Sequence, residues 1–437
     1  MDILVKVIQF FCCFTLLVGI HEFGHFITAR IFKMRVDKFY IFFDPWFSLF
    51  KFKRGDTEYG LGWLPLGGYC KIAGMIDESM DTEQMAEPAK PDEFRSKPAW
   101  QRLIVMLAGV IMNVLLAIVI YIGISYTWGE SFLPNESVKW GYNFNDAGHE
   151  MGFQDGDKIL SIDGEMIEDV NQIGTRLILS DGDRRVVVER AGREAVVTIP
   201  FEQLIEMRKE KSYKDLYVPK MPFIIDSVAS QGANLLKRGD VAVALNGEAM
   251  SDYTAFREGF GAAKGESVEM TVLRDGAELN ISVAVNNDGV IGVYTRNPYS
   301  YETRHYTLLE AIPAGLNRAV DAIGSYWGQL SLIFQPKTEM YRELGGFMAI
   351  GNMFPSVWDW EDFWLKTAFL SVMLAVMNIL PIPGLDGAHA TFTIYEMVTR
   401  RKPSDKFLEV MGYIGLIFII TLMLYANGND FYRLIFG

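Results

Sequence analysis

The chain has 437 residues, of which 50% are hydrophobic and 22% are charged, so it is too apolar for an ordinary soluble enzyme and too charged for a protein made only of membrane spans. Its formal net charge of −13 argues against broad binding to nucleic acid or to acidic lipid, which needs an extended basic surface. The three cysteines outline no disulfide framework. The balance of apolar and charged residues predicts a membrane protein that also carries polar, folded segments.

Two apolar runs in the first third of the chain predict membrane spans. Residues 5–26 are apolar apart from Lys6 and the group His21, Glu22 and His25, and about 20 such residues can cross a bilayer. A secretory signal is the competing interpretation, but this run has little basic residue content before it and no small-residue cleavage site. Residues 103–126 contain no charge and form the clearest span.

The stretch between these spans, residues 36–75, has the alternating aromatic pattern of β-hairpins. Turn-forming pairs interrupt it at Asp44-Pro45, Arg54-Gly55 and Gly67-Gly68. Because the uninterrupted runs are too short to span a bilayer, we predict a re-entrant or interfacial β-hairpin. Residues 76–97 are polar and acidic, which predicts a solvated loop.

An internal repeat occupies the polar middle of the chain, residues 127–306. Segment 153–165 is echoed by segment 236–248, and each has a Gly-Asp turn, a short apolar run and a second turn of Asp-Gly or Asn-Gly. Each copy ends in a pair of predicted strands, in residues 186–199 and 268–285. The pattern resembles bacterial PDZ domains, which implies two PDZ-like α+β domains at 127–214 and 215–300; a generic repeat of β-hairpins is the alternative.

The last third of the chain predicts one surface helix and two further spans. Within residues 301–360, apolar residues recur at helical spacing from Leu316 to Phe334, which predicts an amphipathic helix lying on the membrane. A third span is predicted at 363–380, ending at Pro381 and Pro383, and a fourth at 410–426. The predicted fold is a polytopic α-helical membrane protein with four transmembrane helices, a core formed by residues 1–126 and 361–437, and two inserted domains.

Basic residues near the span ends predict the orientation in the membrane. They gather in the connection between the first two spans (Arg30, Lys33, Arg35, Lys38, Arg95, Lys97, Arg102) and in the connection between the last two (Arg400, Arg401, Lys402, Lys406). Short connections rich in Lys and Arg stay in the cytoplasm. We therefore predict that the two inserted domains and both termini lie on the external side.

The first span carries a metal-binding pattern. His21, Glu22 and His25 form an H-E-x-x-H motif, and on a helix the two imidazoles project from one face and can bind one metal ion. Glu22 lies beside them, where it can take a proton from a water on the metal. The alternative is a hydrated pair of histidines at a helix end, but ionisable groups in a span cost several kcal/mol unless they are paired, ligated or wet.

A catalytic zinc site needs three protein ligands and one open position, so a third ligand must come from elsewhere. The best candidate is Asp386, which follows the abrupt end of the third span in a segment that begins at Asn378. Taken alone, Asp386 would be a turn residue or a helix N-cap. His389 is either a partner of the ligands or a plain surface histidine.

H-E-x-x-H in the first span, together with N-x-x-P-x-P-x-x-D-G from Asn378 onward, resembles the site-2 protease family. The paired PDZ-like segments resemble its bacterial branch that controls sigma factors, the regulator-of-sigma-E protease group, and residues 59–69 resemble the family's membrane re-entrant β-loop. The resemblance implies that His21, His25 and Asp386 bind Zn²⁺ and that Glu22 is the general base. It also implies that Asn378 helps to hold the substrate near the metal.

The resemblance further implies an enzyme of the bacterial inner membrane that cuts single-span membrane proteins such as anti-sigma factors, with its site towards the cytoplasm. We expect the hairpin that ends at Gly67, Gly68 and Tyr69 to bind the extended substrate by strand pairing, and the PDZ-like pair to contact peptides or proteins. Two other functions stay open. One is a membrane scaffold with an inactive metal site, and the other is a metal transporter, although the other spans lack the ionisable residues of an ion path.

Overall fold

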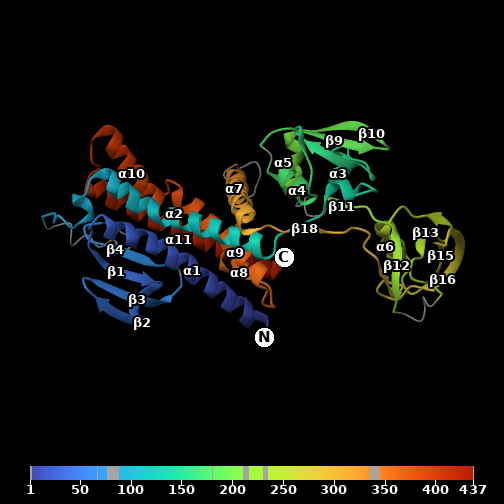
Figure 1. The fold of residues 1–437 in the computed structure, drawn as a ribbon, viewed down its shortest axis with the longest axis horizontal. Helices are drawn as coiled ribbons and strands as arrows, with labels where there is room; N and C mark the ends of the chain where they lie inside the picture. The colour runs from blue at the N-terminus through green and yellow to red at the C-terminus, as the bar shows by residue number, and fades with distance from the viewer. Residues whose placement is uncertain are drawn as a thin grey trace. The chain divides into compact units, whose positions relative to one another are not determined.

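The computed structural model describes residues 2–65, 67–75, 88–179, 181–209, 216–229, 235–333, 335 and 344–436 (Figure 1). The chain divides into two compact units. Ser131–Arg304 forms one unit, and the segments before and after it form the other. Three features of the sequence prediction fall outside the described residues: most of the acidic loop, the boundary at residues 214–215, and Phe334.

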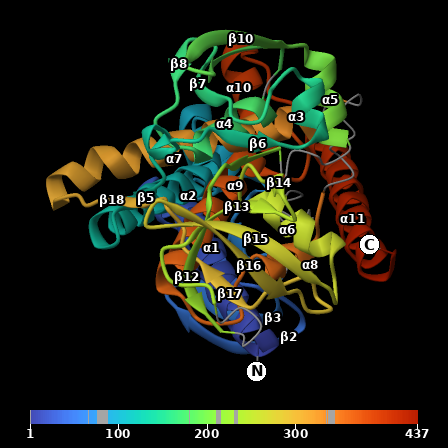
Figure 2. The same cartoon turned by 90° about the vertical axis from the view of Figure 1, so that its right-hand side faces the viewer.

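Four helices in the described part of the chain are long and apolar enough to cross a membrane. They match the four predicted spans, and each begins earlier than predicted: α1 (Asp2–Ile31), α2 (Ala99–Thr127), α9 (Trp360–Ile379) and α11 (Asp405–Phe436). Helix α11 lies at the margin of the other long helices in Figure 2, and only 6% of its most apolar stretch is buried.

Helix α2 is central because glycines let other helices approach it closely. An added Cβ at Gly24 of α1 would lie 2.4 Å from the carbonyl oxygen of Ala108, so no larger residue fits at this crossing. Helix α7 (Leu308–Ile333) meets α2 in the same way, since a Cβ at Gly315 would lie 2.4 Å from the backbone nitrogen of Ile122. The predicted amphipathic helix therefore packs one face of small residues on α2.

The connection between α9 and α11 contains a helix that the sequence did not predict. Two prolines end α9, since proline cannot donate a backbone hydrogen bond, and the chain folds back into α10 (Asp386–Thr399). Gly387 makes the reversal tight: a Cβ there would lie 2.2 Å from the carbonyl oxygen of Leu380. A short helix, α8 (Phe347–Asn352), precedes α9. Asp430 of α11 accepts hydrogen bonds from the backbone N–H groups of Gly346 and Ala349 at the start of α8.

The region between α1 and α2 forms a four-stranded sheet in place of the single re-entrant hairpin that we predicted. Its strands are β1 (Val36–Ile41), β2 (Phe43–Arg54), β3 (Thr57–Leu64) and β4 (Tyr69–Ile72), in the order β2-β3-β1-β4. Only β2 and β3 form a tight hairpin, which turns at Gly55 with a φ of 63°. Strand β1 pairs with β3 in parallel and with β4 in antiparallel, so β4 is an edge strand. A 3-10 turn, Phe94–Ser96, leads into α2.

The first half of the other unit is built on a sheet in the order β10-β9-β7-β8. Its strands are β7 (Lys158–Ile162), β8 (Glu165–Met166), β9 (Arg184–Arg190) and β10 (Arg193–Ile199). Its helices are α3 (Asp146–Glu150), α4 (Asn171–Ile178) and α5 (Phe201–Lys209), with a 3-10 turn at Asn135–Ser137. Ile159, Ile173 and Val188 are fully buried in its core.

The second half has its own sheet, in the order β16-β15-β13-β12-β17, with β14 paired to β13. Its elements are β12 (Phe223–Val228), β13 (Val241–Leu245), β14 (Glu248–Ala249), α6 (Tyr253–Ala262), β15 (Ser267–Arg274), β16 (Ala277–Ala284) and β17 (Val293–Thr295). Two further strand pairs complete the unit: β6 (Tyr142–Phe144) with β11 (Tyr217–Pro219), and β5 (Glu130–Phe132) with β18 (Glu302–Arg304).

An ion pair of the same geometry holds each of these two sheets. In the first, the guanidinium of Arg190 donates two hydrogen bonds of 2.7 and 2.6 Å to the buried carboxylate of Asp157. In the second, Arg274 donates two bonds of 2.7 and 2.6 Å to the buried carboxylate of Asp240. Each aspartate follows a glycine with positive φ, at Gly156 and Gly239.

Candidate active site

Helix α1 brings two imidazoles together in the interior of the protein. His21 and His25 lie one helical turn apart and are 8% and 7% exposed. Their Nε2 atoms are 3.3 Å apart, and the rings meet edge to face. Two histidines at this spacing on one helix face present their lone pairs to a common point.

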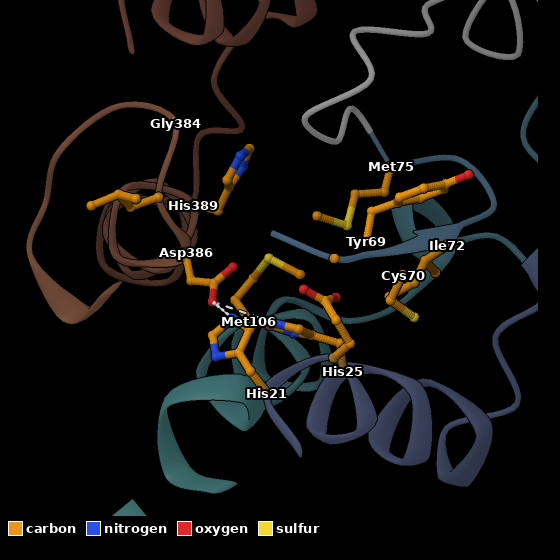
Figure 3. Close-up of a pocket in the computed structure, with 13 residues that line it drawn as sticks. His21, His25, Tyr69, Cys70, Ile72, Met75, Met106, Gly384, Asp386 and His389 are labelled. Carbon is orange, nitrogen blue, oxygen red and sulfur yellow. Dashed lines mark hydrogen bonds and ion pairs between the residues drawn. The ribbon is translucent and has the colours of Figure 1, made fainter. Parts of the chain in front are cut away.

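Asp386 reaches this point from the other end of the sequence. It is the first residue of α10, and its Oδ2 atom lies 3.2 Å from Nε2 of His21 and 3.2 Å from Nε2 of His25. Figure 3 shows the carboxylate projecting from α10 towards the two rings. The tight reversal after α9 places it there, so the helix-start position that Asp386 was expected to favour is compatible with a ligand role.

The three atoms fit a zinc ion. Tetrahedral zinc with bonds of about 2.0–2.1 Å separates its ligand atoms by roughly 3.3 Å. The observed separations of 3.2, 3.2 and 3.3 Å match this value. In addition, Oδ2 of Asp386 is buried and accepts no hydrogen bond among the described residues, which suits an oxygen that binds a metal.

The position of Asp386 also keeps its carboxyl group ionised. Burial by itself would raise the pKa of this carboxyl, but its electrostatic interaction with the imidazoles of His25 and His21 outweighs burial, so the net pKa lies below the usual range. A carboxylate that stays deprotonated is the form that binds a metal.

Glu22 lies next to these three candidate ligands. It is 8% exposed and lines a small cavity of about 60 Å³ together with His21, His25 and Asp386. Such a cavity has room for water. A carboxylate beside a water and a metal site is the arrangement that a general base requires.

Helix α2 orients the two histidines, and the sequence analysis missed this contribution. Nδ1–H of His25 donates to the carbonyl oxygen of Val105 over 2.8 Å, which leaves Nε2 free for a metal. The side-chain amide of Asn113, which is fully buried, lies 3.2 Å from Nδ1 of His21. A half-turn of that amide presents its oxygen to the Nδ1 proton. The signal in the sequence was Asn113, an amide side chain in a predicted span that contains no charged residue.

Gly109 lies between these two contacts on α2. A Cβ added there would be 2.5 Å from Nε2 of His25 and 2.6 Å from Cε1 of His21. No side chain fits in that space. Because Gly109 has none, the imidazole rings can pack directly against the backbone of α2.

The edge strand β4 borders the same cavity. Gly68 and Tyr69 line it, and a Cβ on Gly68 would lie 2.7 Å from the carbonyl oxygen of Tyr40 and 3.0 Å from Cγ of Glu22. Figure 3 shows Tyr69 across the cavity from Asp386. The hydroxyl of Tyr69 donates to Asp44 over 2.9 Å, and its ring stacks on Tyr40. These contacts hold the edge of the sheet beside the side chain of Glu22.

A second, larger cavity of about 430 Å³ adjoins the ligands. Asn378 lines it, and its amide nitrogen is 3.4 Å from Nε2 of His21. Gly67 lines it too, together with apolar residues of α1, α9 and α11 such as Val18, Leu374 and Leu416. The structure thus brings all eight predicted site residues to these two cavities. His389 lines both and projects from the same side of α10 as Asp386 (Figure 3).

Comparison with known proteins gives consistent similarities along the chain. The sequence model described as peptidase family M50 matches residues 9–422. The regulator of sigma E protease of Haemophilus influenzae is 26% identical, with 98% of this chain and 98% of the relative covered. Protease RseP of Yersinia pestis is 27% identical, with 99% of this chain and all of the relative covered.

Proposed function

The chain belongs to peptidase family M50 and is a zinc metalloprotease, and from this premise we propose that it cleaves single-span membrane proteins within or at the edge of the bilayer. The observation that carries the proposal is the convergence of His21, His25 and Asp386 on one point at the end of an apolar helix. Because two of the three ligands lie in a helix that could cross a membrane, the site would act on substrates that enter or touch the membrane.

In this proposal His21, His25 and Asp386 hold the zinc ion and Glu22 is the general base. Zinc held there supplies Lewis-acid chemistry that polarises the scissile carbonyl and activates a water molecule. Glu22 takes the proton from the attacking water and delivers it to the leaving amine. Val105 and Asn113 keep the Nε2 atoms of the two histidines turned inward.

The substrate is proposed to bind as an extended strand along β4. A helical peptide bond is shielded by its own turn, so the substrate must unwind before cleavage, and its freed backbone groups need partners that lipid cannot supply. The position of β4 at the edge of the sheet, with Gly67 and Gly68 beside the cavities, supports strand addition there. Asn378 would contact the substrate from the opposite side.

The substrate class is proposed to be anti-sigma factors already trimmed by another protease. The name of the Haemophilus influenzae relative, regulator of sigma E protease, supports this class. The two sheets of Ser131–Arg304 are proposed to be tandem PDZ-like domains that contact peptides or proteins and exclude substrates with large external parts. The matching Asp157–Arg190 and Asp240–Arg274 pairs support a repeat.

The enzyme is proposed to lie in the bacterial inner membrane, with the PDZ-like domains and both termini outside and the active site towards the cytoplasm. The basic residues that follow α1 and those between α10 and α11 support this orientation, since such connections stay inside. Single Ser251→Cys and Ser404→Cys variants, treated in intact cells with a thiol reagent that does not cross the membrane, test this orientation. The cysteine at 251 should be labelled from outside, and labelling of the cysteine at 404 from outside would contradict the orientation.

Glu22→Gln tests the proposed chemistry. The variant keeps the shape of the side chain and should retain zinc while it no longer cleaves a single-span reporter, because the amide cannot accept the proton. Glu194→Gln, at an exposed position of β10, is the matched control and should cleave normally. Undiminished cleavage by Glu22→Gln would remove Glu22 from the mechanism. If cells with the Glu22→Gln variant lost cleavage but kept the function of the wild-type protein, a scaffold would be favoured.

A further inference from the structure

The four-stranded sheet between α1 and α2, which we call the membrane sheet, exposes a row of large apolar side chains on its outer strand β2. Trp46 is 91% exposed, and Phe47, Leu49, Phe50 and Phe52 are between 49% and 62% exposed. Soluble surfaces rarely expose an apolar patch of this kind. We conclude that lipid covers the outer part of β2.

Contacts with α1 give the depth of the sheet along that helix. Phe42 stacks on Phe14, Phe39 packs on Phe26, and Nη2 of Arg30 donates to Oγ1 of Thr57 over 3.1 Å. The helix rises by about 24 Å between Phe14 and Arg30, which is most of a hydrocarbon core of about 30 Å. The sheet therefore extends from the membrane interior to the membrane surface, and the β2–β3 turn lies at the surface near Arg30.

A cleft of about 550 Å³ lies at this turn, and two arginines line it. Arg30 comes from the end of α1 and Arg54 from the end of β2, while Phe52 and Tyr59 form the apolar wall. Within the described residues, neither guanidinium has an ion-pair partner. The hydrogen bond to Thr57 and the ring of Phe26, 5.7 Å from Cζ, hold Arg30 in place.

Two arginines that line one cleft without a carboxylate partner among the described residues favour a bound oxyanion, and phosphate oxygens match the planar donor geometry of arginine. The apolar side of the cleft indicates where the rest of the ligand lies. Phe52 stacks on Tyr59, and the same face of β2 continues into the membrane with Phe50. A ligand with a phosphate at one end and an acyl chain at the other fits both features.

We propose that the Arg30–Arg54 cleft binds the headgroup phosphate of an anionic phospholipid, in the leaflet at the Arg30 end of α1, with an acyl chain along Phe52 and Phe50. The site is local, so it is consistent with the acidic net charge of the whole chain. The bound lipid would fix the β2–β3 hairpin at the membrane surface, and through β3 and β1 it would support the edge strand β4. This site is separate from the metal and does not rest on the proposed proteolysis.

The test measures lipid binding to the full-length protein in detergent by native mass spectrometry. The probes are phosphatidylglycerol, phosphatidylcholine and inorganic phosphate. The test variant is Arg30→Gln/Arg54→Gln. The matched control is Lys51→Gln/Lys53→Gln, which removes the same total charge from the strand that carries Arg54. Alternation along a strand places these lysines on the opposite face from Arg54. Zinc content verifies that each variant is folded.

At about 1 kcal/mol for each basic residue near the membrane surface, the double arginine variant should bind phosphatidylglycerol roughly 30-fold more weakly. Arg54→Gln alone should lose about fivefold, which keeps the test informative if the double variant does not fold. The lysine control should change by less than about threefold, and the wild-type protein should prefer phosphatidylglycerol to phosphatidylcholine. Equal losses in the two double variants, no preference between the lipids, or equal affinity for inorganic phosphate would each overturn the proposal.

Discussion

Replacement of Gly109 by alanine is expected to disable the zinc site by adding one methyl group to a helix that supplies no ligand. The new Cβ would lie 2.5 Å from Nε2 of His25, where ordinary contact begins at 3.4 Å, so the overlap is 3.4 − 2.5, or 0.9 Å. The second overlap, at 2.6 Å, is with Cε1 of His21. Zinc ligand distances tolerate changes of only about 0.2 Å.

The two histidines can escape this overlap only by movements that damage the site. If the rings rotate, His25 loses its bond to Val105 and His21 loses its contact with Asn113. Loss of such supporting contacts weakens metal affinity by about 10- to 100-fold each. If α1 and α2 move apart, the overpacking destabilises the fold by about 1–3 kcal/mol. We therefore expect zinc affinity to fall by at least about 100-fold.

Zinc occupancy over a series of chelator-buffered concentrations measures this effect, and thermal unfolding of the same samples reports stability. Gly123→Ala is the matched control, because Gly123 lies on the same helix and an added Cβ there meets nothing within 4 Å. Alanine is the better helix former, so the control should be neutral or stabilised by up to about 1 kcal/mol. If Gly109→Ala bound zinc within threefold of this control, the steric account of the site would be wrong.

Two further predictions concern positioning and acid stability. Tyr69→Phe removes only the hydroxyl that donates to Asp44, so zinc content should be unchanged. The KM for a membrane-protein reporter should rise several-fold more than kcat falls, and an unchanged KM would argue against a role of this contact in holding the strand edge. Arg274 lowers the pKa of the Asp240 carboxyl below its ordinary value of about 3.9, so this pair stabilises the second sheet above that pH, and the stabilisation is lost as the pH falls through the lowered pKa. The protection factors of the β13 amides in the full chain, which correct exchange rates for their intrinsic pH dependence, should therefore fall in acid for the wild type, and Asp240→Asn should show less of this pH dependence.

Local periodicity in the sequence was sufficient for three residues of the site. The four-residue spacing of His21 and His25 fixes their common face on any helix, and Glu22 follows from the same motif. The four apolar runs could be assigned to helices for a similar reason, since length and the lack of charge are properties of one segment. These features depend on neighbours in the chain and need no information about distant residues.

The remaining parts of the site depend on contacts between distant segments. Asp386 reaches the histidines only because the chain reverses tightly at Gly387 against the end of α9. Asn113 stands out in the sequence as a polar residue in an apolar run, but neither Asn113 nor Gly109 indicates which helix packs against α2 at that point.

The order of the membrane sheet was also decided by the tertiary structure. Consecutive strands with turns between them predict hairpins, yet β1 pairs with β3 and β4 becomes the edge. Strand pairing depends on which partners meet when α1 and α2 pack, and no local pattern records that choice. The sequence by itself therefore determined which segments are helical, apolar or turning and which two histidines share one helix face. Packing between segments far apart in the chain brought Asp386 to the two histidines, and it decided the support of the histidines and the free strand edge.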